Sequence, residues 1–455
     1  MMKEMKVEII SRKTIRPSSP TPHHHKNFKL SLLDQRHSPN LYGNMIFFYS
    51  STSNYDHTYG DFNPHALKMS SRLQKSLSKT LVHFYPLAGR LKDAATIECN
   101  DQGVYFVEAR MDCHLLNFLS QPDSTLFQHF IPTSSAEKED VIVLLVQLTV
   151  FNCGGIAIAV SLLHKIADAS SLCTFVQSWT AASTALDQSE FIGHDQRLGQ
   201  VLPLFIGSSL LPPSEMLITR TLDIPDPHQN FTTRRFVFST SKMASLKAKA
   251  AITTNNPTNV ELVSAVVVKC AIAAAQSIST SSSRPSVLFH AMNLRKRMVS
   301  PLPANSVGNL VWAFPVLIEE SDIKLHEVVV KLRKGLTDFC NDKANRFKGE
   351  DGFAVVSEYH TKEAEFISKG VNIFRCTSLC KFPIYDMDFG WGKPTWVATS
   401  MGFKNFIVLI DSKLGENIEA WVTLAEQEMA IFQRDEMLLS FASLNPSAAV
   451  HESRM

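Results

Sequence analysis

The 455-residue sequence lacks any run of basic residues and any marked excess of one charge. Its 45 Lys and Arg side chains nearly balance 43 Asp and Glu, which leaves a formal net charge of +2 at pH 7. Proteins that hold nucleic acid or an anionic membrane generally carry a large basic surface, so this balance argues against both as main partners. We therefore expect the partners to be small molecules.

Several catalytic and metal-binding motifs are also absent. The sequence has no G-x-S-x-G nucleophile elbow, no G-x-x-x-x-G-K phosphate loop and no H-E-x-x-H zinc helix. Its eight cysteines have no C-x-x-C spacing, and the closest pair, Cys376 and Cys380, lacks a second pair of ligands. These absences predict no metal site, and they indicate reduced, mostly buried thiols in a cytoplasmic protein.

Long hydrophobic runs are scarce. The N-terminal residues carry charges at Lys3, Glu4 and Lys6 and no apolar segment, so no secretory signal is expected. One segment, Val141–Leu163, is uncharged over a length that could cross a bilayer. The N-C-G-G sequence at 152–155 interrupts it, and its β-branched halves predict two buried strands joined by a tight turn. We expect no membrane association.

The remaining pattern alternates helix and strand signals in two blocks, which is typical of the α/β class. Leucines at helical spacing predict a helix over 64–81, and strands are expected near 95–109. Five prolines over 185–230, without a sustained period, indicate a long crossover before a second block begins. The expected domains are residues 1–185 and 231–455, joined by a crossover loop at 186–230.

A candidate general base occurs where the second strand of the predicted hairpin ends. His164 and Asp168 form an H-x-x-x-D pattern, and histidine is the usual proton acceptor at neutral pH. Spacing alone is weak, because the same pattern occurs at His57–Asp61 in a polar loop. Only His164 lies at a strand-to-helix turn, where α/β proteins bind ligands. A buried core histidine followed by a helix-capping aspartate is the alternative.

A second unusual segment is DFGWGKP at 388–394. The sequence has neither the H-R-D loop nor the Gly-rich loop of a kinase, so Asp388 has no kinase around it. A dinucleotide fingerprint is also excluded, because Pro394 pushes Lys393 toward an extended conformation instead of a helix start. The segment is predicted to be a rigid turn that enters a strand.

Together, HKIAD at 164–168 and DFGWG at 388–392 resemble the two signature motifs of the plant BAHD family of acyl-CoA-dependent acyltransferases. The segments LSLLDQ at 30–35 and NLRKRM at 293–298 resemble the same family. This resemblance implies two chloramphenicol-acetyltransferase-like domains, each a mixed β-sheet with flanking helices, and a channel between them. It also implies that residues 388–409 cross back to the first domain, and that the enzyme is a monomer.

The resemblance further implies a role for each motif residue. His164 would be the general base that activates an acceptor hydroxyl or amine toward acyl-CoA, with no permanently bound cofactor. Asp168 would pair with Arg295 as a structural brace. Asp388 is the second signature acid and is grouped with His164 as a catalytic candidate. It would act from outside the reaction centre, in a loop shaped by Gly390, Trp391 and Gly392. Phe48 is expected either to line the acceptor pocket or to belong to the strand core.

Within the family, the sequence is most similar to the vinorine synthase-like subgroup. This likeness implies acetyl transfer from acetyl-CoA to an alkaloid or terpenoid alcohol. The family's Y-F-G-N segment is replaced by Ser306–Asn309, which argues against a malonyl-transferring anthocyanin enzyme. The alternatives are a catalytically idle relative that binds a metabolite, transfer of a benzoyl group or transfer to an amine, and a hydrolase that uses the same histidine on water.

Overall fold

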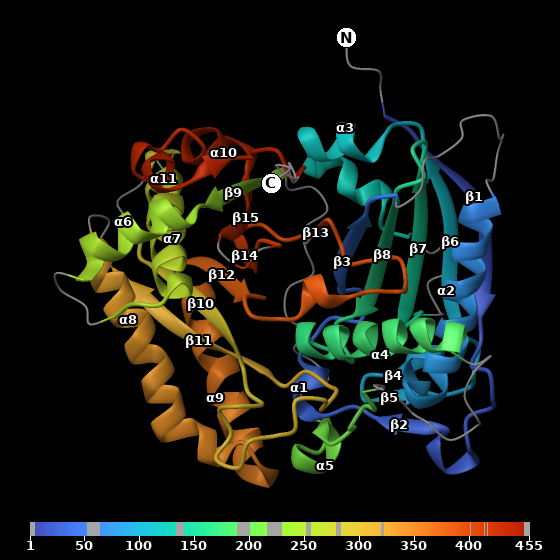
Figure 1. Ribbon diagram of the computed structural model, residues 1–455. Helices are drawn as coiled ribbons and strands as arrows, with labels where there is room; N and C mark the ends of the chain where they lie inside the picture. The colour runs from blue at the N-terminus through green and yellow to red at the C-terminus, as the bar shows by residue number, and fades with distance from the viewer. Residues whose placement is uncertain are drawn as a thin grey trace.

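Two β-sheets lie side by side in the computed structural model, each flanked by helices (Figure 1). The structure describes residues 5–51, 64–132, 141–188, 201–215, 230–251, 256–278, 284–319, 323–400, 402–413, 415 and 417–449. Most of the predicted crossover at 186–230 and the second H-x-x-x-D pattern at 57–61 lie outside these residues. The described part of the crossover includes a short helix, α5 (Gly207–Leu210).

The first sheet has six strands, of which only one adjacent pair, β6 and β7, is parallel. The predicted hairpin is present, and its turn places Gly154 at a φ of +78°. All sixteen residues of its two strands are buried, which explains why the segment lacks polar alternation. In spatial order the strands are β1 (Val7–Ile15), β6 (Val104–Met111), β7 (Leu144–Phe151), β8 (Ile156–Leu163), β3 (Tyr42–Tyr49) and β13 (Trp396–Ser400).

The second sheet has seven strands and is also mixed, with parallel pairs on both sides of β12. In spatial order it contains β11 (Val311–Ile318), β10 (Ser286–Asn293), β12 (Asn372–Ser378), β14 (Phe406–Asp411), β15 (Ile418–Ala425), β9 (Phe231–Phe238) and β16 (Ser443–Leu444). A small third sheet packs beside the first unit and contains β2 (Asn27–Lys29), β5 (Thr96–Glu98) and β4 (Arg90–Asp93).

Two segments cross between the units and help to place the site. Strand β13 comes late in the sequence but pairs antiparallel with β3 of the first sheet. The next strand, β14, belongs to the second sheet, so the segment expected to cross back at 388–409 divides between the two sheets. In the other direction, Leu32 and Leu33 of α1 (Leu32–Gln35) pack into the core of the second unit. Helix α1 is thereby fixed at the junction of the two units.

The flanking helices pack against each other and against the sheets of the two units. Helices α2 and α4 contact each other, and the Trp179 indole of α4 donates to the Leu73 carbonyl of α2 at 3.2 Å. Their bounds and those of the other helices are α2 (Pro64–His83), α3 (Leu115–Ser120), α4 (Ala169–Gln188), α6 (Thr240–Ala251), α7 (Asn259–Ile278), α8 (Leu325–Asp338), α9 (Gly349–Ser368), α10 (Glu426–Phe432) and α11 (Glu436–Phe441).

One helix, α7, has the length and apolar content of a membrane span. Its most apolar window is 61% buried inside the fold, where the helix packs against α8, α10 and the second sheet. Those contacts are the ordinary surroundings of a core helix. The eight cysteines are all unpaired, and four of them are buried, namely Cys99, Cys173, Cys270 and Cys376.

Candidate active site

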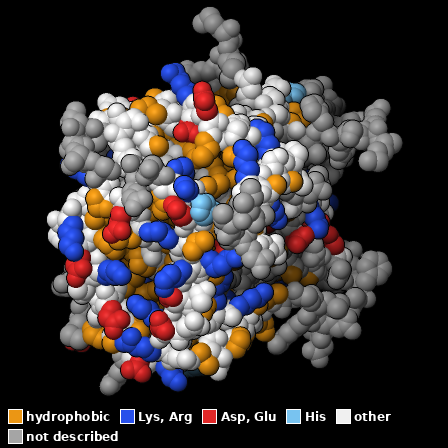
Figure 2. Space-filling view, turned by 90° about the vertical axis from the view of Figure 1, so that its left-hand side faces the viewer, with side chains coloured by type: hydrophobic (Ala, Val, Ile, Leu, Met, Phe, Trp, Pro, Cys, Tyr) orange, Lys and Arg blue, Asp and Glu red, His pale blue; other side chains and the backbone are white. Residues whose placement is uncertain are grey.

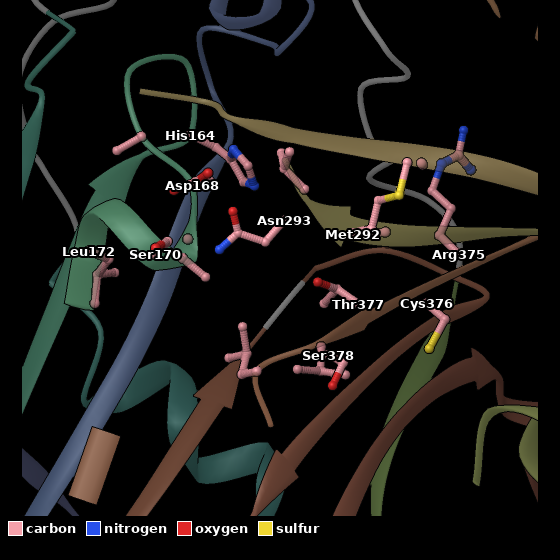
Figure 3. Close-up of a pocket in the computed structure, with 18 of the residues that line it drawn as sticks. His164, Asp168, Ser170, Leu172, Met292, Asn293, Arg375, Cys376, Thr377 and Ser378 are labelled. Atoms are coloured by element: carbon pink, nitrogen blue, oxygen red, sulfur yellow. The ribbon is translucent and has the colours of Figure 1, made fainter. Parts of the chain in front are cut away.

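A cavity of about 230 Å³ opens between the two sheets. Its first wall comes from β3, the end of β8 and the start of α4, and its second wall from β10, β11, β12 and α9. Figure 3 shows His164, Asp168 and Ser170 on one side of the cavity and Cys376, Thr377 and Ser378 on the other. Both units therefore contribute to the same site.

His164 lies at this cavity, directly after β8, and its ring nitrogens have different surroundings. Nδ1 lies 3.0 Å from Oδ1 of Asn309. The Asn309 amide nitrogen donates at 2.7 Å to the backbone carbonyl of His164, which can only accept, so the amide oxygen must face the ring. Nδ1 of His164 therefore carries the proton, and Nε2 keeps the lone pair that a base needs.

A buried carboxylate fixes the orientation of Asn309. Oδ1 of Asp34 accepts from the Asn309 backbone N–H at 2.8 Å and from its side-chain amide at 2.9 Å. The other oxygen accepts from the backbone and the hydroxyl of Ser31, which closes the capping box of α1. Burial raises the pKa of Asp34, while the hydrogen bonds from Ser31 and Asn309 oppose that shift. Helix α1 thus orients the base through Asn309.

A second imidazole lies against the base. The ring of His37 stacks on that of His164 with centroids 4.3 Å apart and planes at 20°. Burial lowers the pKa of His37 well below its usual value, and the proximity of His164 and the positive charges of Arg36 and Lys165 lower it further. His37 is therefore neutral at pH 7 and limits the rotation of the His164 ring without competing for its proton.

Asp168 and Arg295 form the buried ion pair that the resemblance implied. The guanidinium donates to both carboxylate oxygens, at 2.8 and 3.0 Å, and both side chains are almost inaccessible to solvent. The same carboxylate accepts from the backbone N–H of Ser171 at 2.8 Å and so caps α4. Arg295 also donates twice to the Ser306 carbonyl. The pair therefore joins the turn after His164 to the second unit.

Asp388 lies outside the residues that line the cavity. Its Oδ1 accepts from the backbone N–H groups of Gly390 and Gly392 at 2.7 and 2.9 Å, and both glycines have a φ of +105°. The hydroxyl of Ser183 in α4 holds this loop by donating to the Phe389 carbonyl at 2.7 Å. The predicted rigid turn before a strand is present, and its location argues against a catalytic part for Asp388.

Two aromatic candidates lie away from the cavity as well. Phe48 is fully buried in a cluster of rings that includes Phe118 and Trp396 and is not among the residues that line this cavity, so of its two alternatives the structure favours the strand core. The second half of its strand, β3, is buried on both faces, and the side chains of that strand that line the cavity are Asn44 and Met45. Trp391 stacks on Phe389 with centroids 5.5 Å apart and stabilises the loop from inside.

Sequence reasoning missed Asn309, Asp34 and His37 as parts of the site. Asp34 lies in LSLLDQ and Asn309 in the S-V-G-N segment, so the signal available was their position in segments that resemble the family. Nothing in the sequence indicated that His37 would contact His164. In the part of the chain that the structure describes, no group of three or more His, Cys, Asp or Glu is arranged to hold a metal ion.

One oriented imidazole lies at a cavity between two mixed sheets, and this arrangement is compatible with general-base chemistry on two bound substrates. The thiol among the lining residues, Cys376, is a poor nucleophile because burial raises its pKa to about 12. The site therefore fits direct transfer between two substrates better than a covalent enzyme intermediate.

Known proteins share both the sequence and the fold. The sequence model described as Transferase family matches residues 5–439. Akuammiline synthase 1 from Alstonia scholaris is 39% identical, with 96% of this chain and 97% of that protein covered. Limonoid 7-O-acetyltransferase from Citrus sinensis is 38% identical, with 97% and 99% covered. The crystal structure of vinorine synthase matches with a TM-score of 0.81 and 32% identity, covering 97% and 100%.

The chain belongs to the BAHD family of acyltransferases. It is therefore an enzyme that uses acyl-CoA as its co-substrate and a small molecule as acceptor. The family prediction and the two-domain α/β fold are both confirmed.

Proposed function

We propose that this enzyme transfers an acetyl group from acetyl-CoA to a hydroxyl of a plant specialised metabolite, an alkaloid or terpenoid alcohol, with His164 as the general base. The observation that carries the proposal is the hydrogen bond between His164 Nδ1 and Asn309, which in the neutral imidazole leaves the lone pair on Nε2. The choice of acetyl follows the similarity to limonoid 7-O-acetyltransferase and to the vinorine synthase-like subgroup.

The chemistry needs one base and two oriented substrates. Nε2 takes the proton of the acceptor hydroxyl while its oxygen attacks the thioester carbonyl. The tetrahedral intermediate collapses with cleavage of the carbon–sulfur bond, and the protonated His164 returns the proton to the CoA thiolate. The products are the ester and free CoA, so atoms and protons balance. Holding both substrates at one base supplies much of the rate through proximity.

In this scheme the charged groups around His164 are positioning residues. Asp168 and Arg295 hold the turn that follows the base. Asp34 orients the side-chain amide of Asn309, whose oxygen accepts the hydrogen bond from Nδ1 of His164. The loop of Asp388 supports the entry to β13 from a distance. We also propose that the enzyme works as a cytoplasmic monomer, and its eight unpaired cysteines support the reducing compartment.

The test uses purified enzyme and its His164→Ala variant with acetyl-CoA and a panel of alkaloid, terpenoid and phenolic alcohols. We expect wild type to yield products that gain one acetyl group, together with an equal amount of free CoA. The variant should bind acetyl-CoA and give at least a hundredfold less product. Equal transfer by both proteins would show that His164 is not the base. Release of CoA without an acetylated product would favour hydrolysis instead.

A further inference from the structure

Arg36 is a buried guanidinium in the wall of the cavity. It follows the last residue of α1, and only 6% of the residue is exposed. The guanidinium carbon lies 4.5 Å from the ring centre of Trp312 and 4.5 Å from that of Tyr359. Both rings also line the cavity, so the charge of Arg36 is placed by aromatic faces from the second unit.

This charge has no counter-ion within the described residues. No carboxylate there forms an ion pair with Arg36, and its Nε is buried without a hydrogen-bond partner. The side chain does hydrogen-bond Tyr359, but burial raises the pKa of that phenol to about 12, so it stays neutral at pH 7. Aromatic faces stabilise a desolvated cation only in part, and an uncompensated buried charge is unusual.

The other charged groups of the cavity do not balance it. Asp168 is the only carboxylate among the lining residues, and Arg295 already neutralises it. Arg375 of β12 also lines the cavity (Figure 3) and donates to Glu363 at 2.9 Å. On the molecular surface around α8, by contrast, positively and negatively charged side chains are interspersed (Figure 2). The unbalanced positive charge is therefore a local property of the cavity.

We propose that Arg36 selects the acceptor: its guanidinium donates a hydrogen bond to a carbonyl or carboxylate oxygen of the acceptor, and its charge disfavours acceptors that carry an ammonium group. This inference rests on the proposed function and narrows its substrate class. The favoured acceptor is an oxygen-rich alcohol that is neutral or anionic, such as a terpenoid with lactone or ester groups. An alcohol with a protonated tertiary amine is disfavoured.

The first experiment measures competition between two acceptor classes at a fixed acetyl-CoA concentration. One class is limonoid alcohols with lactone carbonyls, and the other is alkaloid alcohols with a protonated tertiary amine. We expect wild type to favour the limonoid class at least tenfold in kcat/KM. Arg36→Met keeps the apolar stem and removes the charge, and should reduce that ratio at least tenfold. Arg375→Met removes a paired arginine from the same cavity and should change the ratio less than threefold.

Raising the pH supplies a second readout. The alkaloid loses its positive charge as the pH passes the pKa of its own amine, so the discrimination by wild type should weaken there. The ratio for Arg36→Met should stay nearly constant over the same range. Equal use of both classes by wild type, or a ratio that Arg36→Met leaves within twofold, would overturn the proposal.

Binding to the His164→Ala protein separates this inference from the proposed reaction. That protein keeps Arg36 and should bind the limonoid probe at least tenfold more tightly than the alkaloid probe, whether or not transfer occurs. Adding Arg36→Met should remove the difference. Failure of acetyl transfer with this preference intact would overturn only the proposed function. Equal binding of the two probes, or binding of neither by a protein that still binds CoA, would overturn the role of Arg36.

Discussion

Breaking the Asp168–Arg295 pair should cost both stability and activity. Arg295→Met leaves the Asp168 carboxylate buried without a counter-ion and removes two hydrogen bonds to the Ser306 carbonyl. Removal of one partner of a buried ion pair typically costs about 3–5 kcal/mol. Asp168→Asn keeps an oxygen for the α4 cap but leaves the guanidinium unpaired, so we expect about 3 kcal/mol.

The double variant shows whether the loss comes from the pair. Asp168→Asn with Arg295→Met leaves no uncompensated charge, so its free energy of unfolding should exceed the additive expectation by about 2 kcal/mol. The activity should fall at least a hundredfold in each single variant, because the turn that follows His164 loses its brace. Urea unfolding followed by tryptophan fluorescence and steady-state kinetics provide both values. Single variants within about 0.5 kcal/mol of wild type with full activity would refute this reasoning.

Four further substitutions test other parts of the structure. Asn309→Ala removes the group that accepts the hydrogen bond from Nδ1 of His164, so kcat should fall about 10- to 100-fold in steady-state kinetics. Acetyl-CoA binding, measured by calorimetry, should not change. An unchanged kcat would show that Asn309 does not set the tautomer of His164. Burial lowers the pKa of His290 to about 4, so the unfolded chain binds more protons below pH 6.5 and stability should decrease from pH 6.5 toward pH 4. In urea titrations, His290→Phe should reduce the pH dependence of the free energy of unfolding by at most about 1.4 kcal/mol per pH unit. The same pH dependence in wild type and variant would contradict the lowered pKa of His290. Gly392→Ala should lower the free energy of unfolding by about 1 kcal/mol because of its φ of +105° alone. In Gly390→Ala the added Cβ would also collide with the guanidinium of Arg72, so this variant should have a lower melting temperature than Gly392→Ala.

The sequence predicted those parts of the site that depend on local pattern. The hairpin before His164 is a continuous apolar segment interrupted by a turn sequence, and both halves are buried strands. The turn at 388–394 follows from glycine and proline chemistry. The pairing of Asp168 with Arg295 came from resemblance to a family and not from spacing, because 127 positions separate the two residues.

The parts that could not be predicted depend on how the two units dock. Asn309 reaches His164 only because Asp34 of α1 holds it, and α1 packs into the second core although it precedes the first sheet's β3. Arg36 and His37 follow α1 and so reach the cavity for the same reason. Phe48 was ambiguous because the second half of β3 is buried on both faces, which removes the alternation that would separate core from pocket.

Under the proposed function, this arrangement separates the control of rate from the control of acceptor choice. The base is held by buried polar contacts that are fully engaged, from Asn309 on Nδ1 and from the brace behind the turn. The wall across the cavity instead has side chains such as Met292 and Thr377 at strand ends, where a change of size or polarity leaves those contacts intact. Arg36 belongs to neither group, because its charge faces the cavity but its position depends on rings of the second unit. Under the proposed function, we therefore expect substitutions in that second wall to alter which acceptor binds and to leave the geometry at His164 unchanged.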